Sequence, residues 1–124
     1  MLRLLLILLM LLLGRRSTGM MPVDPVEEVP VTTVVVIGRT ELERMVVEAF
    51  PEDPHTAMRI VTCESNWNPN AVSRTDDHGL FQINRIHLQP GGVGYGMDPY
   101  DPKQNIQIAR ALYEQSGWYP WVCY

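Results

Sequence analysis

The stretch CESNWNPNAVSRTDDHGLFQIN, residues 63–84, places carboxylates at two points where the predicted local structure changes. Glu64 comes at the end of a run with helical spacing. Asp76 and Asp77 come shortly before GLFQIN, a segment in which side chains alternate as they do in a strand. This order of helix, turn-rich segment and short strand is the starting point for the fold that we expect.

Glu64 completes one face of a predicted helix. Asp53 followed by Pro54 predicts the helix start, because aspartate is a good N-cap and proline suits the first helical position. The residues that precede Glu64 at the i, i+3, i+4, i+7 spacing are apolar: Ala57, Ile60 and Val61. An apolar pocket and the negative end of the helix dipole both disfavour a carboxylate, so we expect a raised pKa for Glu64.

A carboxylic acid that stays protonated near neutral pH can donate a proton to a poor leaving group, such as a glycosidic oxygen. Glu64 therefore becomes a candidate general acid. The alternative is that the helix frays by Cys63 and that Glu64 lies in water, as most glutamates do. Spacing alone leaves both interpretations open.

The segment GLFQIN predicts a short strand with Phe81 and Ile83 on one face and Leu80, Gln82 and Asn84 on the other. The amides of Gln82 and Asn84 are suited to hydrogen-bonding sugar hydroxyl and acetamido groups. At an exposed strand end, the same side chains need no function.

Two further helices are predicted, one on each side of this stretch. Thr40 with Glu43 forms a capping box for the first, and Pro51 ends it. Asp101 caps the last helix, and Gln104 completes a second capping box.

Asn105 lies on the apolar face of that last helix. A buried asparagine needs hydrogen-bond partners, so it either braces the site or contacts a substrate. Gly117 ends the helix, and we expect the aromatic residues of GWYPWVC, 117–123, to pack in the core rather than to bind sugars.

The two cysteines, Cys63 and Cys123, predict a disulfide that ties the C-terminal tail to the body in an oxidising compartment; two buried free thiols are the alternative. The three histidines, His55, His78 and His87, are scattered and form no metal-binding pattern with them. We expect no metal and no cofactor.

Residues 1–19 carry an early arginine, an apolar run and then small polar residues, which is typical of a signal peptide; an uncleaved membrane anchor and an artefactual start are the alternatives. Residues 20–38 are rich in proline and valine and predict an extended linker, although 31–37 could form a strand. The remaining unit, 39–124, is predicted to be a single small domain. We expect a secreted or extracytoplasmic monomer that contacts a membrane only through an uncleaved N-terminus.

The 124 residues carry a formal net charge of −4, and no run of Lys and Arg lies in the body of the chain. A nucleic-acid partner is therefore disfavoured, because phosphate backbones attract clustered positive charge.

Taken together, these residues resemble the lysozyme-like superfamily, specifically the soluble lytic transglycosylase (SLT) domain and its lysozyme relatives. The resemblance runs from about Glu41 to the C-terminus and rests on several short patterns in a fixed order: Glu64-Ser65, Asn68-Pro69, Ala71, Gly79-Leu80-Phe81-Gln82, Asn105-Ile106 and Gly117-Trp118. It implies an α+β, mostly α fold, in which a small β-hairpin flanks a groove that binds glycans.

The resemblance implies that Glu64 is the catalytic acid, that Ser65 supports it, and that Gln82 and Asn105 line the cleft. The implied substrate is the β-1,4 bond between N-acetylmuramic acid and N-acetylglucosamine in peptidoglycan. We favour a lytic transglycosylase that forms 1,6-anhydro ends. A non-catalytic glycan-binding module and a purely structural exported domain are the alternatives, and the sequence does not tell wall remodelling, secretion or a phage lysin apart.

Hydrolysis would require a second carboxylate to support the transition state. Asp77 occupies the place at which animal-type lysozymes carry theirs, immediately before the hairpin pattern, although the connecting turn is shorter here. The alternative for Asp76 and Asp77 is an ordinary turn.

Overall fold

The computed structural model describes residues 19, 21–22 and 36–123. The predicted signal peptide or anchor, except for its last residue, and most of the predicted linker lie outside these residues. The chain divides into two units, Met1–Val34 and Val35–Tyr124, and all helices and strands given below belong to the second. None of the helices in the described ranges has the length and apolar character needed to cross a bilayer.

Helix α2, Arg39–Ala49, begins before the predicted cap, so the capping box of Thr40 and Glu43 is wrong. Gly38 takes the N-cap position without a side-chain hydrogen bond. Arg39 then pairs with Glu43 one turn later, at 2.8 Å. This ion pair engages the Glu43 side chain, which the predicted capping box required. The helix ends before Pro51, as predicted.

Helix α3, Pro54–Ser65, confirms the predicted start and includes the whole predicted face up to Glu64. The Asp53 side chain accepts the Thr56 N–H at 3.3 Å, and Pro54 takes the first helical position. The helix continues through Glu64 to Ser65, so it does not fray at Cys63.

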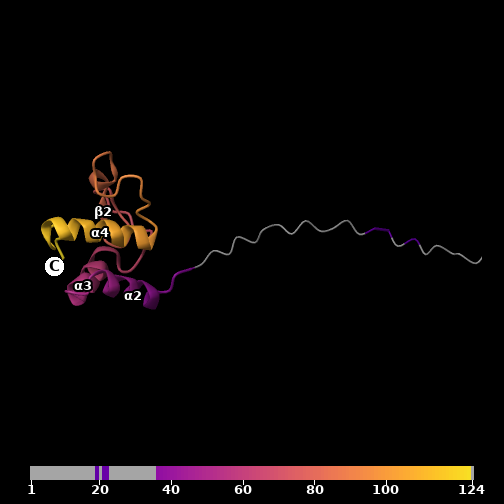
Figure 1. Cartoon of the computed structure of the whole chain (residues 1–124), viewed down its shortest axis with the longest axis horizontal. Coiled ribbons are helices and arrows are strands. Elements are labelled where there is room, and N and C mark those ends of the chain that lie inside the picture. The colour runs from indigo at the N-terminus through magenta and orange to yellow at the C-terminus, as the bar shows by residue number, and fades with distance from the viewer. Residues whose placement is uncertain (1–18, 20, 23–35, 124) are drawn as a thin grey trace, which may run out of the picture. The chain divides into compact units, whose positions relative to one another are not determined.

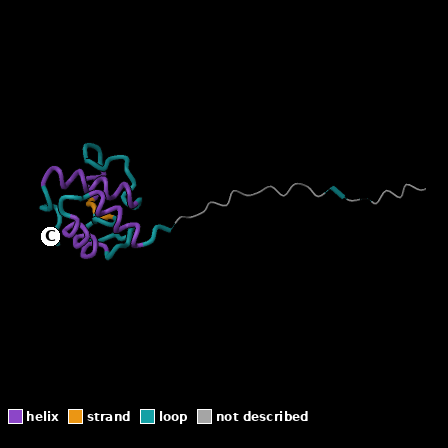
Figure 2. The backbone as a smooth tube through the Cα atoms, turned by 60° about the horizontal axis from the view of Figure 1, so that its bottom comes forward, coloured by secondary structure: helices purple, strands orange, loops and turns teal. Residues whose placement is uncertain are grey.

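The predicted strand over GLFQIN is wrong for residues 79–82, which form a turn. Strands β1, Asp77–His78, and β2, Ile83–Asn84, pair antiparallel around this turn (Figure 2). Positive φ angles at Gly79 (75°) and Gln82 (49°) reverse the chain there. A left-handed conformation at two positions is incompatible with a continuous strand.

After β2, the 3-10 helix η1, Arg85–Leu88, leads through a loop to helix α4, Pro102–Ser116. Asp101 caps α4 as predicted, accepting the Gln104 N–H at 3.0 Å. The second capping box is incomplete, because the Gln104 side chain accepts the Asp98 N–H at 2.9 Å instead of that of Asp101. Gly117 ends the helix with φ 60°.

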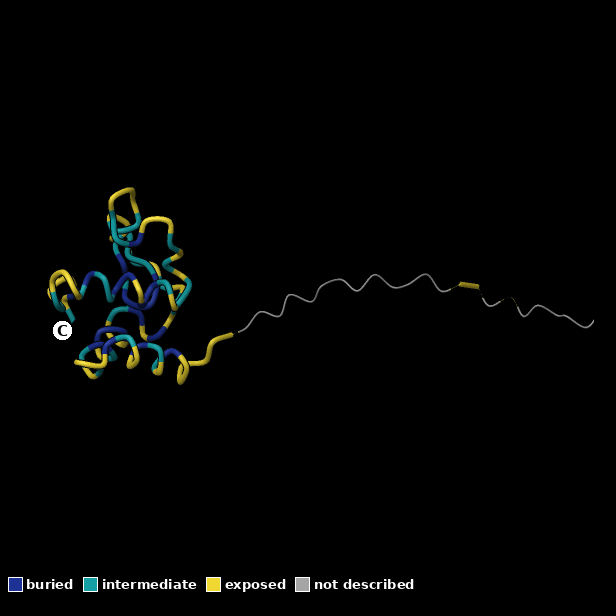
Figure 3. The backbone as a smooth tube through the Cα atoms, in the orientation of Figure 1, coloured by how far each residue is buried: buried dark blue, intermediate teal, exposed yellow. Residues whose placement is uncertain are grey.

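The core lies where the helices and the hairpin meet. Helix α4 packs against both α2 and β2, and α2 also packs against α3 (Figure 1). The buried segments gather in the interior of this unit (Figure 3), and their largest fully buried side chains include Phe50, Phe81, Ile60 and Ile108. Phe50 contacts Phe81 and Trp118 at ring-centroid distances of 5.4 and 5.0 Å.

The C-terminal tail is fixed by two devices. Cys63 and Cys123 form the predicted disulfide. Trp121 is buried, and its indole N–H donates to the Phe81 carbonyl at 2.8 Å. The prediction of core packing is wrong for Tyr119, which is 83% exposed and lies two residues before the Trp121 anchor.

Candidate active site

Glu64 lies one residue before the end of α3 and is partly buried. Burial raises its pKa, and the negative charge of Asp77 raises it further. Both causes act in the same direction, since each penalises the ionised form. Glu64 is therefore suited to hold a proton at a pH where an exposed glutamate has lost its own.

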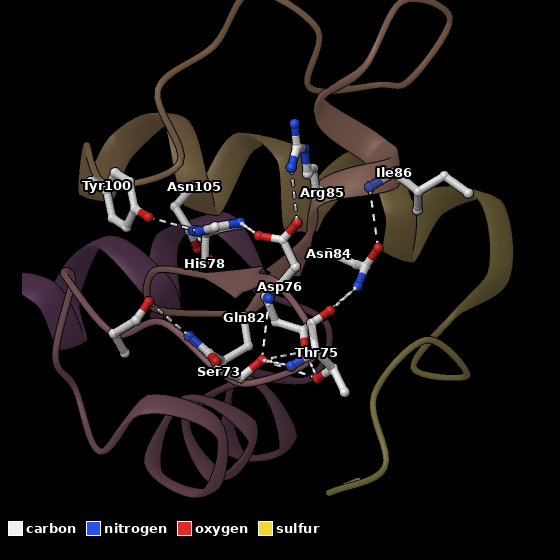
Figure 4. A network of polar contacts seen from close by, with 12 residues as sticks. Ser73, Thr75, Asp76, His78, Gln82, Asn84, Arg85, Ile86, Tyr100 and Asn105 are labelled. Atoms are coloured by element: carbon white, nitrogen blue, oxygen red, sulfur yellow. Dashed lines mark hydrogen bonds and ion pairs between the residues drawn. The ribbon is translucent and has the colours of Figure 1, made fainter.

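The Asp77 carboxylate lies in a hydrogen-bond network whose donors, Ser73, Thr75 and Asn84, are labelled in Figure 4. Its carboxylate accepts from the Ser73 hydroxyl at 2.6 Å, from the Thr75 hydroxyl and from the Asn84 amide at 2.8 Å. Burial alone would raise the pKa of Asp77, but these hydrogen bonds, with a contribution from His78, outweigh it and lower the pKa. Hydrogen bonds to a carboxylate favour its ionised form.

Ser73 and Thr75 were missed at the level of sequence. Besides donating to Asp77, Ser73 accepts the Asp77 N–H at 3.1 Å, and its own N–H donates to the Asp77 carbonyl at 3.0 Å. The pattern Ser-x-Thr-x-Asp, 73–77, is the signal that could have indicated it, because hydroxyl side chains commonly bond to groups two to four residues away.

The two carboxyl groups therefore differ in their environments. Glu64 is partly desolvated and feels a neighbouring negative charge, whereas Asp77 is surrounded by donors. Paired groups whose environments push their pKa values apart are typical of an acid and an ionised partner in a catalytic site. This arrangement can protonate a leaving group and place a negative charge near the positive charge that develops on a sugar ring.

Unusual backbone conformations gather in this same part of the chain. The non-glycine residues with positive φ in the described part are Asn66, Trp67, Asp76 and Gln82, and all lie between Glu64 and Asn84. Such conformations cost about 1–3 kcal/mol each and persist where the surroundings fix them. Trp67, for example, is buried and donates its indole N–H to Thr62 at 2.9 Å.

The predicted substrate-binding residues Ser65, Gln82 and Asn84 all bond within the protein. The Ser65 hydroxyl donates to the Val61 carbonyl at 3.1 Å and is buried. The Gln82 amide nitrogen donates to two main-chain carbonyls of the hairpin region, those of Ala71 and Gly79. Asn84 holds Asp77 with its amide nitrogen and accepts the Ile86 N–H with its oxygen, so its contacts are those of a positioning residue.

Asn105 is completely buried and bonds only to main-chain groups in the contacts described. Its oxygen accepts the Phe81 N–H at 2.9 Å, and its nitrogen donates to the carbonyls of His78 and Pro99 at 2.9 and 2.8 Å. These contacts join the hairpin to α4. Asn105 therefore braces the hairpin against α4. Its side chain is fully buried and has no exposed surface that a substrate could contact.

Within the described ranges, no group of three or more His, Cys, Asp and Glu side chains is arranged to hold a metal ion. Glu64 and Asp77 lie near enough for the charge of Asp77 to raise the pKa of Glu64.

Comparison with known protein families gives a match to the transglycosylase SLT domain over residues 42–117. The matched range contains Glu64, the Asp77 network and the Asn105 brace. Searches of curated proteins and of solved structures returned no match.

Proposed function

Because the chain belongs to the transglycosylase SLT domain family, we propose that it cleaves the β-1,4 bond between N-acetylmuramic acid and N-acetylglucosamine in peptidoglycan, with Glu64 as general acid and base. The observation that carries this assignment is the environment of Glu64. Its pKa is raised by burial and by Asp77, at the end of the helix that precedes the hairpin.

In the proposed reaction, the protonated Glu64 donates its proton to the glycosidic oxygen as the bond between that oxygen and C1 of N-acetylmuramic acid breaks. The resulting carboxylate then takes the proton of the 6-hydroxyl of the same sugar, and that oxygen attacks C1. The product carries a 1,6-anhydro end, and no water is consumed. A single group that both gives and takes a proton is sufficient for this sequence.

Hydrolysis is a second candidate outcome, and the Asp77 network favours it. Three side-chain donors lower the pKa of Asp77, which lies near a carboxyl group whose pKa is raised. In a retaining hydrolase the second carboxylate acts as nucleophile or stabilises the oxocarbenium-like transition state, and water completes the reaction. Formation of a 1,6-anhydro end by attack of the 6-hydroxyl does not require a second carboxylate, so it does not explain why three side chains donate to Asp77.

Mass spectrometry of the soluble products tests the proposal. The oxidised protein is incubated with peptidoglycan beside a Glu64→Gln variant. Products lighter by one water than hydrolysis products, and absent with the variant, would support a lytic transglycosylase. Reducing-end products would support the Asp77-assisted hydrolase. A folded protein that stays bound to cell walls and releases nothing would overturn the enzyme and favour the glycan-binding module.

The location of the substrate supports an extracytoplasmic protein, and the Cys63–Cys123 disulfide agrees with an oxidising compartment. Export through residues 1–19 is part of this proposal. Sequencing the N-terminus of the mature protein in the producing cell would test it.

A further inference from the structure

A second polar cluster lies on the hairpin, separate from the Asp77 network. His78 Nε2 lies 2.8 Å from Asp76 Oδ1, and His78 Nδ1 lies 2.7 Å from the Tyr100 hydroxyl. Arg85 approaches the other oxygen of Asp76 at 3.4 Å. Figure 4 shows these four side chains close together, away from Ser73 and Thr75, which precede β1.

Three members of this cluster, all except Tyr100, line an open groove, which we call the hairpin groove. Its walls are formed by Asp76, His78, Arg85, Leu88, Gln89 and Pro90. Glu64 and Asp77 are not among the lining residues. Asp77 and His78 are consecutive residues of β1, so their side chains point to opposite faces of the hairpin. The hairpin groove and the Asp77 side chain therefore lie on opposite faces of the hairpin.

Arg85 is a charged group of the hairpin groove that has donors available to a ligand. Its side chain is 67% exposed, and its contact with Asp76 is long at 3.4 Å. Charge-assisted hydrogen bonds are normally about 2.7–2.9 Å, so Asp76 holds this guanidinium weakly. A guanidinium has five N–H donors in a fork that matches a carboxylate, and the contact with Asp76 occupies one.

The charge balance of the hairpin groove limits the kind of ligand. Arg85 contributes one positive charge and Asp76 one negative charge. A polyanion would therefore be attracted by Arg85 and repelled by Asp76. A ligand with both a free carboxylate and a free amine would satisfy both groups. Leu88 and Pro90 add apolar walls that suit short aliphatic side chains.

We propose that the hairpin groove binds the stem peptide of peptidoglycan, with Arg85 holding a free peptide carboxylate and Asp76 facing a peptide amine. This inference rests on the proposed function, since the same substrate then occupies the site of Glu64 and the hairpin groove. An extended peptide of about four residues reaches up to about 14 Å, whereas the two strands of a hairpin lie only about 5 Å apart, so such a peptide is long enough to extend from one face of the hairpin to the other. A stem peptide that branches from a sugar beside Asp77 can therefore pass around the hairpin to Arg85.

The test compares glycan strands with and without stem peptides, using the full oxidised chain and its Arg85→Gln variant. The matched control is Arg59→Gln, which changes an exposed arginine on α3 away from the hairpin groove. We expect Arg85→Gln to lower kcat/KM about tenfold on peptide-bearing strands, mainly through KM, because a charge-assisted hydrogen bond is lost. On peptide-free strands, and for the control on either substrate, we expect no change.

Equal losses on both substrates, or no loss on peptide-bearing strands, would overturn the proposal. Titration with a free synthetic stem peptide, followed by nuclear magnetic resonance, separates this result from failure of the proposed function. If the protein cleaves neither substrate, about tenfold weaker peptide binding by Arg85→Gln still supports the hairpin groove, whereas absence of binding by the unaltered protein overturns it. Displacement of the peptide by an equal concentration of inorganic phosphate would also overturn it, because it would indicate an unselective anion site.

Discussion

Glu64 and Asp77 show how the surroundings of two carboxyl groups shift their pKa values in opposite directions. Glu64 has its pKa raised by burial and by a like charge, and Asp77 has its pKa lowered by Ser73, Thr75 and Asn84 despite burial. The helical spacing indicated the raised pKa of Glu64, because burial of this residue depends on a single apolar helix face. The lowered pKa of Asp77 depends on a folded turn that brings three donors to one carboxylate, which no linear pattern specifies in full.

Replacement of Glu64 by glutamine is expected to abolish cleavage and to stabilise the fold at neutral pH. Loss of a general acid typically costs at least about 100-fold in rate. The folded-state pKa of Glu64 is raised, so its contribution to stability is present below its unfolded-state pKa and is lost as the pH rises through the folded-state value. At about pH 7 the ionised Glu64 is therefore destabilising, and Glu64→Gln removes that penalty.

Thermal unfolding at about pH 4 and about pH 7, together with product release, checks this prediction. The Tm of Glu64→Gln should exceed that of the unaltered protein at the higher pH and match it at the lower. Glu48→Gln, on the exposed surface of α2, is the control and should retain activity. A Tm difference that is equal at both pH values would contradict the raised pKa.

Replacement of Asp77 by asparagine is expected to move the alkaline limb of the pH–activity profile to lower pH. The charge of Asp77 is one cause of the raised pKa of Glu64, so removing it lowers the pH at which Glu64 loses its proton. Near-complete loss of turnover would support the hydrolase, whereas retained activity with a shifted limb would support anhydro-forming cleavage. Asp76→Asn, which changes the neighbouring residue that faces His78, should leave the limb in place. An unshifted limb in an active Asp77→Asn variant would show that the two groups are not coupled.

At the scale of elements, the helices were predictable from local signals, and the family resemblance implied a small hairpin, but the position of its turn was not predicted. Asp53 and Asp101 cap α3 and α4 through bonds to residues three positions later, so the signals are local. The turn at 79–82 is fixed by Asn105, which lies 24 residues away from its partner Phe81. The alternation of GLFQIN predicted a strand, but Leu80 and Phe81 are both fully buried because long-range contacts prevailed over the local pattern.

Gly79 is where the hairpin meets α4 most closely. A Cβ atom at this position would lie 2.2 Å from the Pro99 carbonyl oxygen and 2.4 Å from Asn105 Nδ2, and φ is 75°. Because Asn105 Nδ2 is itself bonded to that carbonyl, neither neighbour can move without breaking the brace. We expect Gly79→Ala to lower the free energy of unfolding by about 2–3 kcal/mol and to reduce activity.

Gly96→Ala is the matched control for Gly79→Ala. The φ of Gly96 is 78°, and no atom lies within 4 Å of the added Cβ. Gly96→Ala therefore strains the backbone as Gly79→Ala does, but its added methyl group does not clash with a neighbouring atom. We expect about 1 kcal/mol for this variant. Urea denaturation of the two proteins measures the difference, and equal losses would mean that the close approach to Asn105 is unimportant.

At the scale of the whole molecule, a small folded unit depends on the attachment of its C-terminal tail. The described helices and hairpin provide a limited core, and small domains are commonly supported by disulfides. The Cys63–Cys123 bridge spans a sequence separation of 60, and Cys63 directly precedes Glu64. Trp121 holds the same tail independently through its buried ring and its bond to Phe81.

This double attachment predicts that removing the disulfide lowers stability more than it lowers activity. For a loop of this size, the chain-entropy model gives about 4 kcal/mol for the bridge. A variant with both Cys63→Ala and Cys123→Ala should therefore unfold at a lower urea concentration. Under conditions in which it remains folded, it should cleave peptidoglycan at the normal rate, because Trp121 keeps the tail in place. Adding Trp121→Phe removes the hydrogen bond to Phe81 and should then reduce kcat/KM. If the cysteine-free protein is folded but inactive, the bridge itself positions Glu64, and Trp121 does not hold the tail alone.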